Sequence, residues 1–521
     1  QQEEAERLYG EALPLYQQIG DRRGEANVQE ARGEVARMQD RYQEAERLYR
    51  EALSVYRQIG DRLGEANVQK ARGDVARMQD RYEEAERLYG EALPLYRQVG
   101  DGRGQANAQQ ARGDVALMQA RYEEAERLYG EALPLYRQVG DRRGQANVQQ
   151  ARGDVARMQA RYEEAERLYG EALPLYGQIG DRRGEANVQQ ARGDVARMQA
   201  RYEEAERLYG EALSQYRRIG DRLGEANVQQ ARGDVARMQD RYEEAERLYG
   251  EALPLYRQIG DRRGEANVQT ARGDVARMQD RYEEAERLYG EALPLYGQIG
   301  DRLGEANVQK GRGDVARMQA RYEEAERLYG EALPLYRQIG DRLGQASVQK
   351  ARGDVARMQA RYEEAGRLYG QALPLYRQIG DRLGQASVQK ARGDVALVQD
   401  RYEEAERLYG QALPLYRQIG SRLGEANVQK GRGDVARMQD RYEEAEQLYG
   451  EALLLYRQIG SRLGEAGALF SMGRLARATP GKDEEARWRF TEAARIYTAI
   501  GDTEWARRAA EAAASGLKPT Q

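Results

Sequence analysis

Apolar residues recur at three- and four-residue steps along most of the chain, a spacing typical of amphipathic α-helices. One such face lies between residues 82 and 99 and consists of Tyr82, Ala85, Leu88, Tyr89, Ala92, Leu93, Tyr96 and Val99. A thinner face precedes it and consists of Leu63, Val68, Ala71, Val75 and Met78. The pattern therefore predicts two helices in succession, and i,i+4 charge pairs such as Glu83 with Arg87 support the second one.

The residues around these segments favour helix boundaries. Gly60 followed by Asp61 places a helix-ending glycine beside an N-capping aspartate. Asp80 lies three residues before Glu83, the spacing of a capping box at the start of the second helix. Because the equivalent of Asp80 is Ala120 in another copy of the pattern, we expect this cap to help without being required.

The two-helix pattern repeats every 40 residues. A five-residue segment reading ARGDV or a near copy occurs eleven times, first at Ala31 and last at Gly431. We therefore expect an all-α solenoid of about twelve helix-turn-helix repeats, each packed mainly on its neighbours. The expected organisation is a partial repeat with only the second helix at 1–20, eleven near-identical repeats at 21–460, a divergent last repeat at 461–501, and a capping helix and tail at 502–521.

Proline recurs inside the second helix of most repeats, as at Pro94. An interior proline lacks the N–H of the helix ladder and clashes with the carbonyl four residues back, which here belongs to Gly90. We predict a bend at this point, with Gly90 letting the backbone yield. The tyrosine stripe of Tyr82, Tyr89 and Tyr96 is predicted to belong to the core.

The second helix resembles a known family. Tyr82, Ala85, Tyr89 and Ala92 have the spacing of the aromatic and small residues in the second helix of the tetratricopeptide repeat, and Gly73 matches its small residue in the first helix. The long unit is similar to the kinesin-light-chain type. The resemblance implies a right-handed superhelix whose first helices line the concave side, and a role in binding proteins.

The first helix departs from that family at two sites. Gln69 and Arg72 stand where large apolar residues are expected, and only the last repeat has apolar residues there. Three interpretations follow: a polar ladder between helices, in which Arg72 pairs with Asp74 or with an acid of the next repeat; a binding groove; or a contact surface between copies of the chain. The candidate concave-face residues are Asn67, Gln69, Lys70, Arg72, Asp74, Arg77, Lys310, Arg312, Asp314, Lys350, Arg352 and Asp354.

The composition of the chain argues against most kinds of catalytic and metal site. The chain has no histidine and no cysteine, so the commonest general base and the commonest metal ligands are absent. Lys and Arg number 83 against 87 Asp and Glu, without the basic excess of nucleic-acid binders. We expect no catalytic residues, no cofactor, no metal and no nucleic-acid or membrane partner. No targeting or membrane-spanning segment is visible and the chain starts at Gln1 rather than Met, so we expect a soluble protein whose compartment stays open.

These features predict a non-enzymatic scaffold for protein–protein interaction. Near-identical repeats offer near-equivalent registers to a short peptide, so the array suits a repetitive partner or many copies of one partner. The alternative is a structural protein that assembles with its own copies into a filament, because contacts that do not close generate fibres. The uncovered second helix at 1–20 is compatible with missing upstream residues or with a covering surface.

Overall fold

The computed structural model describes residues 2–515 and their side chains from residue 4 onward. These residues form 26 α-helices and no strand, which confirms the predicted all-α repeat fold. The chain divides into two compact units, Gln1–Gly260 and Asp261–Gln521. We call the first helix of each helix pair the A helix and the second the B helix.

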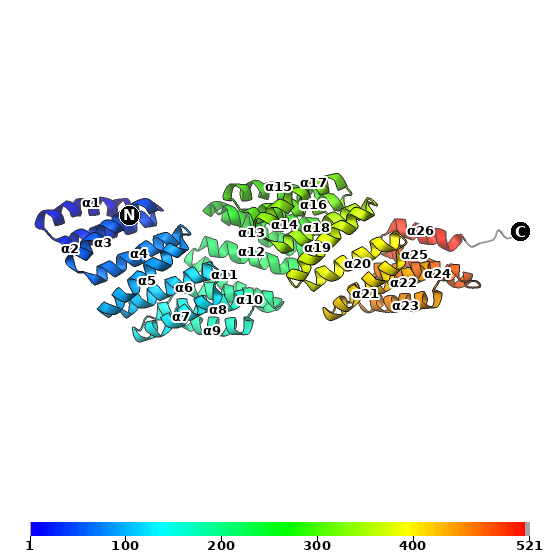
Figure 1. The fold of residues 1–521 in the computed structure, drawn as a ribbon, viewed down its shortest axis with the longest axis horizontal. Coiled ribbons are helices and arrows are strands. Elements are labelled where there is room, and N and C mark those ends of the chain that lie inside the picture. Colours follow the sequence, from blue (N-terminus) through cyan, green and yellow to red (C-terminus); the bar gives the residue numbers. More distant parts are fainter. Residues whose placement is uncertain (1, 516–521) are drawn as a thin grey trace. The chain divides into compact units, whose positions relative to one another are not determined.

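Unit 1 contains seven B helices and six A helices in alternation (Figure 1). The B helices are α1 (Gln2–Ile19), α3 (Tyr42–Ile59), α5 (Tyr82–Val99), α7 (Tyr122–Gln138), α9 (Tyr162–Ile179), α11 (Tyr202–Ile219) and α13 (Tyr242–Ile259). The A helices are α2 (Arg22–Met38), α4 (Arg62–Met78), α6 (Gly102–Met118), α8 (Arg142–Met158), α10 (Arg182–Met198) and α12 (Arg222–Met238).

Unit 2 continues the alternation and ends in one extra helix (Figure 1). Its A helices are α14 (Arg262–Met278), α16 (Arg302–Met318), α18 (Arg342–Met358), α20 (Arg382–Val398), α22 (Arg422–Met438) and α24 (Arg462–Ala478). Its B helices are α15 (Tyr282–Ile299), α17 (Tyr322–Gln338), α19 (Tyr362–Gln378), α21 (Tyr402–Gln418), α23 (Tyr442–Gln458) and α25 (Asp483–Ala499), and α26 (Thr503–Ala514) follows.

Glycines on the A helices let the tyrosines of the B helices pack closely. A Cβ atom built on Gly73 would lie 2.5 Å from Cε1 of Tyr89, so only glycine accommodates this fully buried ring. Tyr96 reaches the A helix of the following repeat in the same way, 2.3 Å from a Cβ placed on Gly104. The core is therefore a series of clusters at successive helix pairs, in which Tyr89 and Tyr96 are buried and Tyr82 is half-buried at its edge.

The turn from a B helix to the next A helix is built as the sequence predicts. Gly60 has φ of +71° and ends α3 in the left-handed conformation. The Asp61 carboxylate then accepts a hydrogen bond from the backbone N–H of Gly64 at 3.0 Å and caps α4. The C-terminal end of one helix and the N-terminal cap of the next are thus satisfied within two residues.

The turn from the A helix to the B helix differs from the capping box that the sequence suggests. Asp80 has φ of +57°, and the N-cap position of α5 is Arg81, which makes no side-chain cap. The N–H of Arg81 bonds back to the carbonyl of Ala76 at 2.9 Å, so Asp80 terminates α4 instead of starting α5. Its carboxylate accepts the Tyr82 hydroxyl at 2.7 Å.

Pro94 lies inside α5, which runs through it without a break. Both Pro94 and Gly90 are exposed, and a Cβ atom on Gly90 would meet no other atom within 4 Å. The Gly90 carbonyl, which loses its helical partner, therefore lies on the solvent side of the helix. The bend expected here stays a prediction.

Within each unit, helices contact the next one or two helices along the chain, as in a solenoid. Unit 2 ends with α26 packed on α25, where Trp505 stacks on Tyr497 with ring centroids 6.0 Å apart and meets Phe470 edge-on at 5.5 Å. The rest of the expected tail, 516–521, lies outside the described residues. No helix in the described part of the chain is long and apolar enough to cross a membrane.

Candidate functional site

Two open cavities lie on the A helices of unit 1. One, of about 470 Å³, lies over α4, α6 and α8, and the other, of about 520 Å³, lies over α8, α10 and α12. Both are lined by the same residue types at equivalent positions of successive helices, namely Asn, Gln or Lys, Asp and Arg. We call this surface the A-helix face.

A tyrosine–aspartate bond recurs along this face. The buried Tyr89 extends its hydroxyl through the core and donates to Oδ1 of Asp74 at 2.8 Å. Burial, followed by the nearby Asp74 carboxylate, raises the pKa of Tyr89. The same bond occurs in the other regular repeats, with Glu34 in place of aspartate in the first of them. A hydrogen bond from a buried tyrosine hydroxyl therefore orients each of these carboxylates.

A second tyrosine holds the asparagine of the face. The Tyr96 hydroxyl donates to Oδ1 of Asn67 at 2.9 Å, which leaves the amide nitrogen of Asn67 outside this bond. The equivalent asparagines Asn107 and Asn147 line the cavity over α6 and α8. Amide donors are thus presented at this position in most repeats, with Ser347 and Ser387 as exceptions.

The residue four before each aspartate decides the charge of the face. Where it is lysine, the ammonium group binds the carboxylate, as in Lys70 with Asp74 at 2.7 Å and Lys310 with Asp314 at 2.7 Å. Burial raises the pKa of Asp314, but Lys310, together with the Tyr329 hydroxyl and Arg277, holds that pKa below its ordinary value. Where glutamine replaces lysine, burial dominates and the pKa of Asp154 is raised.

Gln69 and Arg72 lie away from the cavities, between helices. The Gln69 amide is buried and donates to Glu91 of its own B helix at 2.5 Å, while its oxygen accepts from Arg72 at 2.8 Å. Arg72 also pairs with Glu46 at 2.9 Å. Glu46 belongs to the preceding repeat, whereas the sequence suggested Asp74 or the next repeat. The three side chains join two B helices through one A helix, which leaves little of them accessible to a partner.

The candidates in unit 2 divide in the same way. Lys350 binds Asp354 at 2.8 Å, and both occupy the positions equivalent to Lys70 and Asp74. Arg312 and Arg352 instead pair with glutamates of the preceding B helix, Glu286 at 3.2 Å and Glu326 at 3.0 Å. Among the candidates on α4, Lys70, Asp74 and Arg77 line the cavity over α4, α6 and α8. Gln69 and Arg72 line neither of the two cavities.

One position of the A-helix face was not predicted from the sequence. Leu63, assigned to the apolar face, is 39% exposed, and its equivalent Leu223 lines the second cavity. In most of unit 1 this position is arginine, which reaches the next repeat, as in Arg103 to Asp141 at 2.8 Å. In unit 2 it becomes a row of leucines that are 45–59% exposed: Leu303, Leu343, Leu383, Leu423 and Leu463. The alternation of Leu and Arg at one repeat position was the signal that could have found it.

A family model described as tetratricopeptide repeat matches the chain in eight segments. They are residues 1–58, 24–98, 64–138, 104–178, 182–258, 264–338, 344–418 and 424–499. No curated protein matches the chain.

Solved structures are similar to this chain at low sequence identity. The apo form of RapI is 12% identical, with 63% of this chain and 96% of RapI covered and a TM-score of 0.50. The apo form of the quorum sensor NprR from B. thuringiensis is 17% identical, with 69% and 99% covered and a TM-score of 0.49. A Signal Transduction ATPase with Numerous Domains from Pyrococcus horikoshii, described with a tetratricopeptide repeat sensor, is 15% identical, with 64% and 53% covered and a TM-score of 0.49. The chain thus spans about half of the length of that last protein.

Proposed function

Because the chain belongs to the tetratricopeptide repeat family, we propose that it is a non-catalytic scaffold whose A-helix face binds a protein partner. The observation that supports this proposal is the pair of open cavities on the A helices of unit 1, whose lining repeats from helix to helix. Asparagine amides and paired charges on this face match the donors and acceptors of an extended peptide.

The partner in this proposal is repetitive, or binds in several copies. Most A helices present the same Asn and Asp, so a short unique peptide would find several near-equivalent registers. A partner with its own repeats gains from simultaneous contacts at several repeats. The lysines are engaged by aspartates, as in Lys310 with Asp314, so the face is not a clamp for a free carboxylate.

The two units differ in the chemistry they offer. In unit 1, Arg103 and Arg183 bind aspartates of the following repeats, which makes the face polar. In unit 2 the leucine row places one exposed apolar side chain on each of five successive A helices. Unit 1 has leucine at this position only at Leu63 and Leu223, so the leucine row distinguishes unit 2 from unit 1. We therefore propose that apolar side chains of the partner contact unit 2.

The test is a selection of displayed random peptides against the full chain and against a triple variant. Leu343→Arg, Leu383→Arg and Leu423→Arg introduce the residue that unit 1 itself carries at this position, so the fold is expected to be kept. We expect selected peptides to be rich in apolar residues, to bind the chain at more than one copy in calorimetry, and to lose at least about tenfold in affinity for the triple variant.

A matched control adds the same charges on exposed ends of B helices, through Gln338→Arg, Gln378→Arg and Gln418→Arg. This variant is expected to bind like the original chain. Equal binding to both variants would contradict the proposal. Long regular fibres in negative-stain electron microscopy across a concentration series, in place of separate particles, would favour the self-assembling filament instead.

A further inference from the structure

At several junctions between repeats, one glutamate pairs with two arginines, as Glu86, Glu166, Glu206, Glu286 and Glu326 do. Glu286, on B helix α15, accepts from Arg312 of the next A helix at 3.2 Å and from Arg321, which precedes the next B helix, at 3.2 Å. Glu326 repeats the arrangement with Arg352 at 3.0 Å and Arg361 at 3.5 Å. One carboxylate thus neutralises two guanidinium groups that the packing of the repeats brings together.

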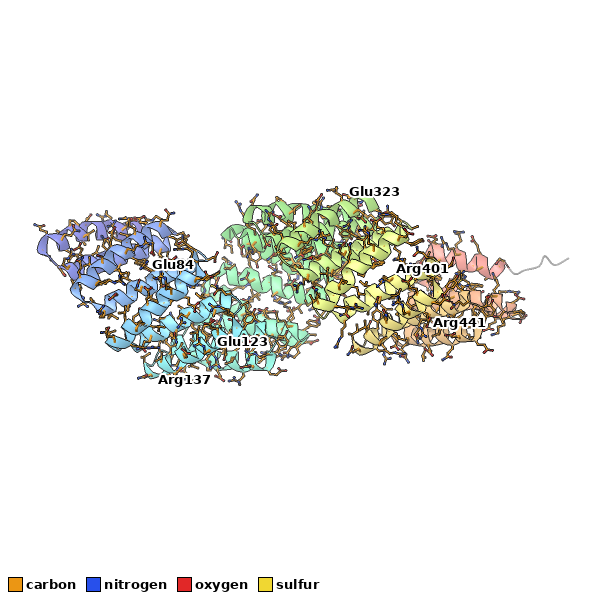
Figure 2. All side chains as sticks on the ribbon, viewed as in Figure 1. Glu84, Glu123, Arg137, Glu323, Arg401 and Arg441 are labelled. Carbon is orange, nitrogen blue, oxygen red and sulfur yellow. The ribbon has the colours of Figure 1, made fainter. Side chains whose placement is uncertain are left out.

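The following junction lacks this carboxylate, because Gly366 occupies the glutamate position on α19. Its two arginines, Arg392 and Arg401, remain. Among the described residues no carboxylate lies within ion-pair distance of Arg392, and its one hydrogen bond is to Gln389 at 3.5 Å. Arg401, labelled in Figure 2, still binds Glu404 and Gln399. Its side chain is 49% exposed, against 39% for the equivalent Arg361, which has the glutamate above it.

A cavity of about 440 Å³ lies at this junction. Gly366, Arg392 and Arg401 line it together with Tyr362, Glu363, Val395, Gln399 and Glu404. The surroundings of Arg392 are cationic: burial lowers its pKa, and although Glu404 opposes this effect, Arg407, Arg377 and Arg401 add to it. A half-buried guanidinium group without a paired carboxylate is unfavourable. A bound anion would provide the negative charge that Glu326 provides for Arg352 and Arg361 one junction earlier.

We propose that this pocket binds one carboxylate group of an external ligand, held between Arg392 and Arg401 where the other junctions hold a glutamate. The ligand carries a single negative charge at this point, because Glu404 already lies against Arg401 and repels a dianion such as phosphate. The carboxylate belongs either to a small organic acid or to an acidic side chain of a bound peptide. The site lies between repeats and is separate from the A-helix face, so it does not depend on the proposed function.

The chain itself provides the matched variants. Gly366→Glu restores the internal carboxylate, and a Cβ atom at Gly366 would meet no other atom within 4 Å, so the variant fits without rearrangement. Glu326→Gly creates the same vacancy one junction earlier, between Arg352 and Arg361. Arg392→Gln removes the cation and leaves a shorter polar side chain.

The experiment measures propionate binding to the full chain by equilibrium dialysis with radiolabelled propionate, at constant ionic strength against chloride. Hydrogen exchange read by mass spectrometry locates the site. We expect one site in the original chain and slower exchange in α20 and the start of α21. We expect binding to weaken about tenfold or more in Gly366→Glu and in Arg392→Gln. Glu326→Gly is expected to show two sites, with new protection in α18 and the start of α19.

Two short peptide amides, one with a single glutamate and one with glutamine in its place, distinguish the two sources of the carboxylate. Binding of the glutamate peptide supports an acidic side chain as the ligand, and binding of propionate alone supports a small acid. The proposal is overturned if neither binds, if Gly366→Glu binds as tightly as the original chain, or if phosphate competes better than propionate.

Discussion

At the scale of single residues, the turn inside each helix pair contains a strained position. The residue that ends each regular A helix has φ between +55° and +58°, although it is always Asp or Ala and never Gly. The left-handed conformation costs an L-residue about 1–2 kcal/mol, and aspartate recovers part of this through local hydrogen bonds, as Asp80 does with Tyr82. Ala120, at φ of +55°, has no side-chain group to do so.

Ala120→Gly is therefore expected to stabilise the turn between α6 and α7. The relief of strain exceeds the extra entropy of glycine in the unfolded chain, so the net gain is up to about 1 kcal/mol. Hydrogen exchange of the α6–α7 segment should slow by a corresponding factor. The control is Gly140→Ala at φ of +70°, which should accelerate exchange at the next turn. Faster exchange in Ala120→Gly would show that the turn is not strained.

At the scale of the element, most B helices contain an interior proline, but some repeats have another residue at the same position. α5 carries Pro94 with Gly90 four residues before it, whereas α3 carries Ser54 with Arg50. Both sites are exposed, so packing does not explain the difference. The glycine and the proline each weaken a helix interior, and the tyrosine and leucine contacts of the other face hold the helix together.

Pro94→Ser is expected to stabilise α5 by about 1–3 kcal/mol, because the restored N–H can bond to the Gly90 carbonyl. The measurement is the free energy of local opening of α5 from hydrogen exchange. The reciprocal variant, Ser54→Pro in α3, should destabilise that helix by a similar amount. If both variants leave hydrogen exchange unchanged, proline does not weaken the helix at this position, and the prediction of a bend at Pro94 is no longer supported.

At the scale of the whole molecule, contacts within each unit are confined to near neighbours along the chain. Stability is then a sum over repeats and their junctions, and unfolding is expected to be cooperative only over segments. The side chains at each junction are interchangeable: removal of residues 101–140 would bring Arg152 to Glu86, in the role that Glu126 has now.

Deletion of residues 101–140 is therefore expected to leave a folded protein with unchanged helical content per residue in circular dichroism. Its central repeats should keep their hydrogen-exchange protection. Deletion of only residues 101–120 is the control, because it places two B helices in succession and removes the glycines on which Tyr96 and Tyr129 pack. That variant should lose protection over several repeats. Equal behaviour of the two deletions would contradict the neighbour-only account.

The sequence by itself determined the helices, the 40-residue period and the tyrosine core. These features depend on local spacing and on caps such as Gly60 with Asp61, which act within a few residues. Local rules failed at Asp80, since its role depends on how two helices meet, and at Leu63, since a thin apolar face does not say which part of it the neighbouring repeat covers.

Only the tertiary structure decided which acid meets each arginine. Arg72 and Glu46 are 26 residues apart and on different repeats, so no local pattern joins them. For the same reason, the sequence alone does not show that Gly366 removes an ion-pair partner of two arginines. Its consequence appears only when packing places Arg392 and Arg401 around it, because the charge of a buried group is balanced by its neighbours in space, whatever their distance along the chain.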